Sequence, residues 1–139
     1  MSDLVISPRI ALELSAKLSQ IQELSTARYL MLGQLSGTLL AEAGSLVGTD
    51  SSVFCALGAA AWSSSASMAK QLKEPTCRSL NLISAEKVIH IVPVGEKTLM
   101  IFVFDSEILP KGFRFLAWKW AEELDALLGM IGSSSRVSG

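Results

Sequence analysis

His90 is the only histidine in this sequence of 139 residues, and it stands between Ile89 and Ile91 in an apolar run. Nucleophilic catalysis needs a serine or cysteine within reach of such a base, with a third group to orient the base. A single histidine inside a strand is more often a packing residue. We therefore expect His90 to be half-buried and non-catalytic, and we expect that the protein is not an enzyme.

Two pairs of carboxylates are the other candidates for acid–base chemistry. Asp105 and Glu107 follow an apolar run, and Glu122 and Glu123 lie on the polar side of a helical pattern. Turn chemistry explains the first pair and a solvated surface explains the second. The sequence contains neither a glycine-rich phosphate loop nor the spacing of metal ligands. We expect no catalytic residue, no cofactor and no metal.

Composition narrows the class of protein further. Two cysteines, Cys55 and Cys77, are too few for a disulfide framework or a metal cage. We expect both to be small buried apolar residues, and we expect the protein to be in a reducing compartment. The net charge is −1 and the Lys and Arg residues are scattered singly, which disfavours nucleic-acid binding. The N-terminus lacks a basic segment followed by an apolar block. We expect a cytoplasmic protein.

Apolar spacing and turn signals predict the elements that hold these residues. A helix opens with Ser7 as N-cap and Pro8 at its first position. Two strands near 28–34 and 38–43 flank Gly37, which suits a tight hairpin. Three more strands are predicted within 76–84, 87–94 and 97–105, and the last two are apolar enough to be covered on both faces. The final helix carries one apolar stripe, made of Phe113, Leu116, Trp120, Leu124, Leu127 and Ile131.

Residues 51–69, SSVFCALGAAAWSSSASMA, contain no charged side chain. The stretch approaches the roughly 20 residues of a bilayer-crossing helix, but its small residues and central serines disfavour a membrane span. We expect a helix, capped by Asp50, Ser51 or Ser52, that packs on the sheet. The stripe predicted to face the sheet contains Phe54, Leu57, Ala61, Met68 and Leu72.

Two more stripes of this helix would stay in water in a monomer. One contains Cys55, Ala59, Trp62, Ala66 and Ala69, and the other contains Ala56, Ala60, Ser63 and Ser67. Small residues let a second helix approach closely, so we predict that this helix packs against a partner subunit. Trp62 would anchor either this dimer or a bound GTPase. Phe115 and Trp118 point away from the apolar stripe of the final helix, and they either contact a partner or cover the first helix.

The order of elements, the small-residue helix and the ending LMIFVFDSEILPKGFRFLAWKWAEELDALL resemble the Roadblock (dynein light-chain roadblock) domain family, and within it the bacterial MglB-like proteins. The resemblance spans roughly residues 8–131. It implies an α+β fold in the order α-β-β-α-β-β-β-α, with an antiparallel sheet of strand order 2-1-5-4-3. The first and third helices would cover one face of the sheet, and the second helix the other. It also implies a homodimer through the second helix and third strand.

The resemblance further implies a homodimeric adaptor that regulates a small Ras-like GTPase by binding its switch regions. We expect a single domain at 1–131 and a disordered Gly/Ser tail at 132–139. The expected dimer interface comprises Cys55, Ala59, Trp62, Ala66, Ala69, Arg78, Leu80 and Asn81. The expected GTPase-binding residues are Ser52, Ala56, Ser63, Ser67 and Lys70.

Two other functions stay open from the sequence. A small antiparallel sheet flanked by helices can hold an apolar pocket, so the chain is alternatively a ligand-sensing module. An accessible polar pocket around His90 would favour that function. An adaptor in a motor complex would use the same surface as a GTPase regulator, and the sequence does not separate these two.

Overall fold

The computed structural model describes residues 6–75, 77–106 and 108–138, with side chains described up to residue 130. The elements within these residues follow the predicted order. They are α1 (Pro8–Ser25), β1 (Tyr29–Gln34), β2 (Leu39–Gly44), α2 (Ser51–Gln71), β3 (Leu80–Ile83), β4 (Val88–Val94), β5 (Thr98–Phe104) and α3 (Phe113–Ser138).

The five strands form one antiparallel sheet in the order β2-β1-β5-β4-β3, which confirms the predicted topology. Two hairpin turns depend on glycines in the left-handed region, Gly37 with φ 99° and Gly95 with φ 68°. The strand β3 pairs with β4 only, so it is an edge of the sheet. It begins at Leu80, later than the predicted start at 76, and Cys77 therefore precedes the strand.

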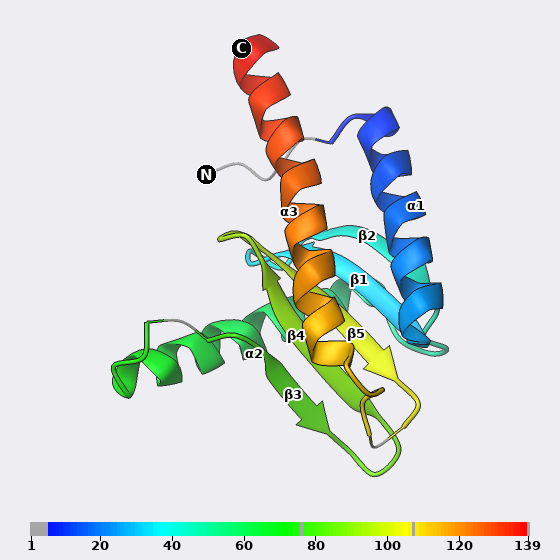
Figure 1. The fold of residues 1–139 in the computed structure, drawn as a ribbon, viewed down its shortest axis with the longest axis vertical. Coiled ribbons are helices and arrows are strands. Elements are labelled where there is room, and N and C mark those ends of the chain that lie inside the picture. Colours follow the sequence, from blue (N-terminus) through cyan, green and yellow to red (C-terminus); the bar gives the residue numbers. More distant parts are fainter. Residues whose placement is uncertain (1–5, 76, 107, 139) are drawn as a thin grey trace.

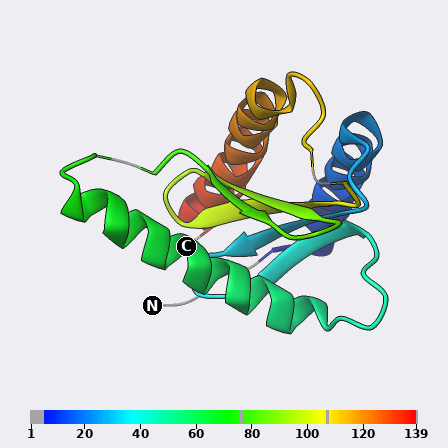
Figure 2. The ribbon, with the colours of Figure 1, turned by 90° about the horizontal axis from the view of Figure 1, so that it is seen from below.

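Helices cover both faces of the sheet. Figures 1 and 2 show α1 and α3 side by side on one face and α2 on the opposite face. All seven residues of β5 are buried, because this central strand has a helical layer above and below it. The apolar runs of the sequence thus correctly indicated a sheet that is covered twice.

The layer of α1 and α3 holds the larger core. Leu14 and Leu18 of α1 meet Phe102 of β5 and Phe113 and Leu124 of α3 in one buried cluster. The N-cap prediction is confirmed, since the Ser7 hydroxyl oxygen accepts a hydrogen bond from the backbone N–H of Ile10 at 3.3 Å. An ion pair of 2.7 Å between Lys17 and Glu123 links the two helices at the surface.

The final helix differs from its predicted form in two respects. Leu116, predicted on the apolar stripe, is 39% exposed, whereas Phe113, Trp120 and Leu124 are buried as expected. The helix continues to Ser138, so the structure extends it through part of the segment 132–139 for which we expect a disordered tail. The predicted side-chain position of Ile131 lies outside the described residues, and the domain boundaries stay a prediction.

Candidate functional site

The helix α2 is fixed at its start by polar contacts. The Asp50 carboxylate accepts hydrogen bonds from the backbone N–H groups of Ser52 and Val53, so Asp50 is the N-cap that the sequence allowed. Glu42 of β2 accepts hydrogen bonds from the Ser51 hydroxyl and the Tyr29 hydroxyl, each at 2.9 Å. Burial is the main reason that the pKa of Tyr29 is raised to about 12. These contacts attach the start of α2 to β1 and β2.

The face of α2 that packs on the sheet is not the predicted one. Cys55, Ala59 and Trp62 are at most 6% exposed and lie in one buried cluster with Ile91 and Ile101. We expected these three residues at a dimer interface, and the structure corrects that assignment, because they are already buried within their own subunit. The prediction that Trp62 is a surface anchor is wrong for the same reason.

The closeness of α2 to the sheet explains this orientation. A Cβ added to Gly33 of β1 would overlap the Cys55 sulfur, and one added to Gly58 of α2 would overlap the end of the Ile101 side chain. Helix and sheet therefore approach where side chains are smallest. The small residues at these two contacts let the first half of α2 lie close to the sheet, and Trp62 fills the space further along the same inward face.

Three bulky apolar residues of α2, and Leu72 at its C-cap, point to solvent. Val53 is 56% exposed, Leu57 64%, Met68 69% and Leu72 77%. The sequence analysis placed Leu57, Met68 and Leu72 against the sheet, and that prediction is wrong. Of the same predicted stripe, Phe54 is half-buried and packs edge-on against Tyr29, with ring centroids 6.3 Å apart. We call Val53, Leu57, Met68 and Leu72 the outward stripe.

The second half of α2 extends past the sheet. Figures 1 and 2 show its C-terminal turns projecting beyond the strands on the side of β3. By helical spacing, Ala66 and Ala69 continue the stripe of Ala59 and Trp62, and both are only half-buried. The inward face of α2 is therefore longer than the sheet below it. We call the part of α2 that projects past the sheet and carries Ala66 and Ala69 the overhang.

The edge strand β3 lies beside the overhang. Leu80 and Leu82 are opposite Ile91 and Ile89 of β4, which places both on the side of the sheet that α2 covers. Leu80 is half-buried and Leu82 is 42% exposed. Asn81 points to the other side, where its side-chain oxygen pairs with Nδ1 of His90. An apolar strip of edge strand thus adjoins the apolar underside of α2.

The expected GTPase-binding residues share one flank of α2. Their helical spacing places them between the inward face and the outward stripe, and all are exposed: Ser52, Ala56, Ser63, Ser67 and Lys70. The outward stripe beside them is an exposed apolar feature that the sequence analysis missed. Its signal was present as bulky residues recurring at helical spacing, but their direction depends on how closely α2 approaches the sheet.

His90 is fully buried, where the sequence predicted a half-buried side chain. Its ring packs edge-on against Phe113, with centroids 5.1 Å apart, and its Nε2 has no hydrogen-bond partner among the described residues. Burial, and then the nearby positive charge of Arg114, lowers its pKa to about 4. An open depression of about 420 Å³ is lined by Asn81 and Arg114 among other residues, but His90 does not line it. This depression is therefore not the accessible pocket around His90 that would favour a ligand-sensing module.

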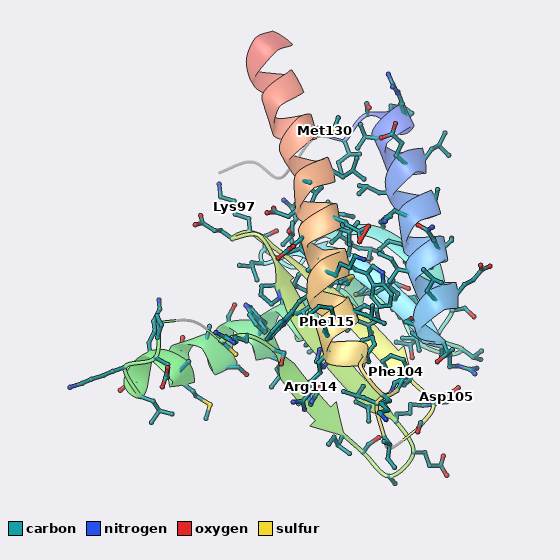
Figure 3. The ribbon with its side chains drawn as sticks, in the orientation of Figure 1. Lys97, Phe104, Asp105, Arg114, Phe115 and Met130 are labelled. Carbon is teal, nitrogen blue, oxygen red and sulfur yellow. The ribbon has the colours of Figure 1, made fainter. Side chains whose placement is uncertain are left out.

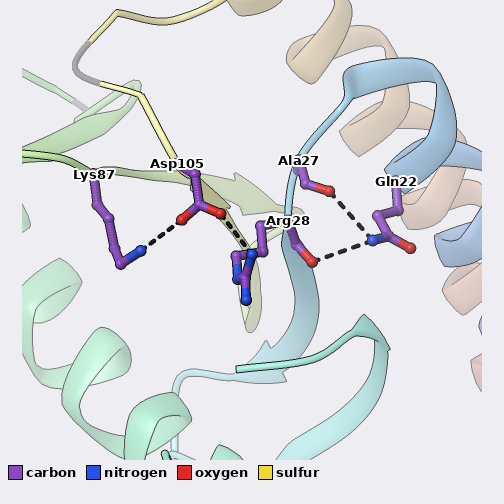
Figure 4. A network of polar contacts seen from close by, with 5 residues as sticks. All are labelled: Gln22, Ala27, Arg28, Lys87 and Asp105. Atoms are coloured by element: carbon purple, nitrogen blue, oxygen red, sulfur yellow. Dashed lines mark hydrogen bonds and ion pairs between the residues drawn. The ribbon is translucent and has the colours of Figure 1, made fainter. Parts of the chain in front are cut away.

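One member of each carboxylate pair forms ion pairs with basic side chains. Asp105 forms ion pairs with Arg28 at 2.7 Å and with Lys87 at 2.5 Å, as Figure 4 shows. The Lys87 hydrogen bond is the main reason that the pKa of Asp105 is lowered. Glu107 lies outside the described residues, and Glu123 is paired with Lys17. No three His, Cys, Asp or Glu side chains in the described part of the chain are placed to hold a metal ion.

The two aromatic residues of α3 that the sequence placed away from the core are exposed. Phe115 is 73% and Trp118 41% exposed, whereas Trp120 is 6% exposed. The guanidinium of Arg78, just before β3, lies over the Trp118 ring, 5.5 Å from its centroid. Arg78 is thus on the opposite side of the sheet from the overhang.

No helix in the described part of the chain combines the length and hydropathy that crossing a membrane requires. This holds for α2 as well, whose small residues and serines disfavoured a membrane span.

Comparison with known families gives one match. Residues 14–104, from α1 to the end of β5, match the profile of the Roadblock/LC7 domain. No curated protein matches the sequence significantly.

Solved structures of similar fold include three MglB proteins. MglB of Myxococcus xanthus matches with a TM-score of 0.81 at 19% identity, over 92% of this chain and 96% of that one. An MglB with a tetrameric arrangement matches with a TM-score of 0.81 at 23% identity, over 94% of this chain and 98% of that one. The gliding protein MglB of Thermus thermophilus matches with a TM-score of 0.77 at 23% identity, over 91% and 96%. These similarities show that the fold is shared.

Proposed function

Because this chain belongs to the Roadblock/LC7 domain family, we propose that it is a homodimeric regulator of a small Ras-like GTPase that contributes no catalytic residue of its own. The observation that carries the proposal is that α2 has no charge up to Lys70 and exposes the bulky apolar residues of the outward stripe. Exposed apolar surface of this kind, next to polar residues, is typical of protein–protein interfaces.

The dimer follows from two features that lie side by side. The overhang leaves Ala66 and Ala69 without a sheet below them, and β3 leaves one strand edge unpaired. Pairing of β3 with the β3 of a second copy would continue the sheet beneath the overhang, and both features would be covered by one contact. An MglB with a tetrameric arrangement has a similar fold, which supports self-association as the proposal.

In this arrangement the interface residues are a corrected subset of the expected ones. Ala66, Ala69, Leu80 and Asn81 remain proposed members, and Leu82 joins them because it is exposed on the same edge. Arg78 is not retained, because its guanidinium lies over Trp118 on the opposite side of the sheet. Cys55, Ala59 and Trp62 support the interface indirectly, by seating α2 on its own sheet.

The GTPase is proposed to bind the exposed flank and outward stripe of the paired α2 helices. Stimulation of GTP hydrolysis often uses an arginine inserted into the phosphate site of the GTPase. Arg28 is paired with Asp105 and Arg78 lies over Trp118, and neither residue is on α2. Regulation would therefore depend on holding the switch loops in one conformation, which requires tighter binding to one nucleotide state.

This proposal is tested by measuring affinity for the cognate GTPase loaded with a GTP analogue or with GDP. We expect a preference of at least about tenfold for the GTP state, which is a coupling of about 1.4 kcal/mol. Ser63→Arg should abolish binding, because it places a bulky charge on the exposed flank of α2. Arg114→Ala, on the opposite layer, should leave binding intact. Equal affinity for both nucleotide states would exclude the regulator and leave a passive scaffold.

A further inference from the structure

The outer face of the first turns of α3 carries aromatic and basic side chains that the proposed function does not use. It is opposite to the buried side of the helix, where Phe113, Ala117 and Trp120 pack on the sheet. Figure 3 shows Arg114 and Phe115 at this end of α3, in front of β4 and β3. We call the group the α3 patch, and its members are Arg78, Lys111, Arg114, Phe115, Trp118 and Lys119.

The α3 patch exposes large apolar side chains next to unpaired positive charge. Phe115 is 73% exposed and Trp118 is 41% exposed. The four basic residues are all exposed, and none forms an ion pair with another described residue. By contrast, Lys17, Arg28 and Lys87 are each paired with a carboxylate. The α3 patch therefore gathers four unpaired cations, beside the exposed Glu122 of the same helix, in a chain whose net charge is −1.

We propose that the α3 patch docks the protein on the surface of an anionic lipid bilayer. Trp and Phe side chains favour the headgroup region of a bilayer, and nearby Lys and Arg are attracted to anionic lipids. The patch is the convex outer face of a helix, and a convex face fits a broad surface better than it fits a peptide. An acidic peptide would need a groove or anchor pocket. The cavity beside Trp118, about 240 Å³, is lined by Glu122 and Asp125, so it offers no anchor for an acidic side chain, and on a bilayer these two carboxylates would offset part of the attraction.

Docking through the α3 patch would leave α2 accessible. The patch belongs to the layer of α1 and α3, and α2 lies on the opposite face of the sheet, as Figure 2 shows. When the protein is bound to a bilayer through the α3 patch, the outward stripe of α2 would therefore face away from the bilayer and could bind a protein partner.

A dimer would attach to the bilayer through two α3 patches instead of one. This part of the inference rests on the proposed function, which includes the dimer. Antiparallel pairing of two β3 edges about a twofold axis keeps equivalent faces of the sheet on the same side. Both α3 patches would then face one bilayer, and two weak attachments bind far more strongly than one. Light scattering without vesicles tests the dimer separately, so its failure is distinguishable from failure of lipid binding.

Tryptophan fluorescence offers a built-in measurement of docking. Trp62 and Trp120 are each 6% exposed, so Trp118 is the tryptophan whose surroundings would change most. Phosphatidylcholine vesicles with phosphatidylserine should shift its emission to shorter wavelength and sediment the protein, and vesicles of phosphatidylcholine alone should do neither. Added salt should weaken the binding, because the attraction is electrostatic.

Matched variants locate the bilayer contact. Arg114→Gln should weaken binding about fivefold, because one cation near an anionic surface is lost. Phe115→Ser should weaken it by a similar or larger factor, and Leu57→Ser, a change at another exposed apolar residue, on α2, should have no effect. Circular dichroism should show that all three variants fold. Absence of binding to phosphatidylserine vesicles at low salt, or equal binding by Phe115→Ser, would overturn the proposal. An acidic peptide that shifts the Trp118 emission when vesicles do not would also overturn it.

Discussion

At the scale of single residues, His90 shows how burial decides chemistry. Its ring is enclosed by Phe102 and Phe113, and its Nδ1 pairs with Asn81 of the edge strand. A fully buried imidazole that is neutral at physiological pH joins β4 to β3 without acting as an acid or base. The same enclosure makes His90 sensitive to acid.

The pH dependence of stability follows from the lowered pKa of His90. In the folded protein this pKa is about 4, compared with 6.5 for an ordinary histidine, so the unfolded chain binds the proton more readily. The stabilisation is complete above pH 6.5 and is lost progressively as the pH falls towards 4. We expect the free energy of unfolding to fall by up to about 1.4 kcal/mol per pH unit across this window.

Urea unfolding between pH 7 and pH 4 measures this effect. His90→Gln keeps an amide that can hydrogen-bond to Asn81 but cannot titrate, so its stability should change much less with pH. The lowered pKa of Asp105 also makes stability fall with acid, but the unfolded carboxyl titrates near 3.8, so this contribution is confined to the acid end of the range. The same slope in wild type and His90→Gln would show that another group is responsible. Dimerisation and partner binding of His90→Gln should be unchanged at neutral pH.

At the scale of elements, α2 combines two faces of unequal importance for stability. Trp62 is buried on the sheet, so Trp62→Ala should lower the free energy of unfolding by about 3–5 kcal/mol. Leu57 is 64% exposed, so Leu57→Ala should change it by no more than about 0.5 kcal/mol. Denaturant unfolding at one fixed protein concentration compares the two variants. Similar losses in both would mean that α2 has a different orientation.

The sequence predicted the elements well because their boundaries depend on local chemistry. Asp50 caps α2, Ser7 caps α1, and Gly37 and Gly95 take the positive φ of their turns. The resemblance to the Roadblock family supplied the order of the strands, which the structure confirms. The late start of β3 was missed, since β3 pairs with only one strand and the residues before Leu80 continue the strand-like pattern.

The orientation of α2 was not predictable from its own sequence. Periodicity identifies three stripes but does not say which one meets the sheet. That choice depends on residues far away in the sequence. Cys55 lies against Gly33 of β1, and Gly58 lies against Ile101 of β5, and these close contacts determine which face of α2 points inward. As a result, Cys55, Ala59 and Trp62 were assigned to a partner although they are core residues. The exposure of Phe115 and Trp118 was predicted correctly, since the apolar stripe of α3 is regular enough to define its outer face.

At the scale of the whole molecule, the sheet separates two surfaces with different properties. On one side are the outward stripe and overhang of α2, without charge up to Lys70. On the other side is the basic and aromatic α3 patch. The edge strand β3 lies between them, and its pairing with a second copy would double both surfaces without mixing them. The central claim is therefore the dimer, from which the proposed arrangement of both surfaces follows.

Light scattering coupled to size exclusion measures that dimer most directly. At about 10 μM or more, a range in which even a modest dimer with micromolar affinity forms, we predict a mass of twice the 14.9 kDa of the chain. Ala66→Glu should be folded and monomeric, because it would bury an unpaired charge at the overhang at a cost of about 3–5 kcal/mol. Ala60→Glu, the same change on an exposed face of α2, should remain dimeric. A wild-type protein of single-chain mass, or an Ala66→Glu variant that is still dimeric, would contradict the account.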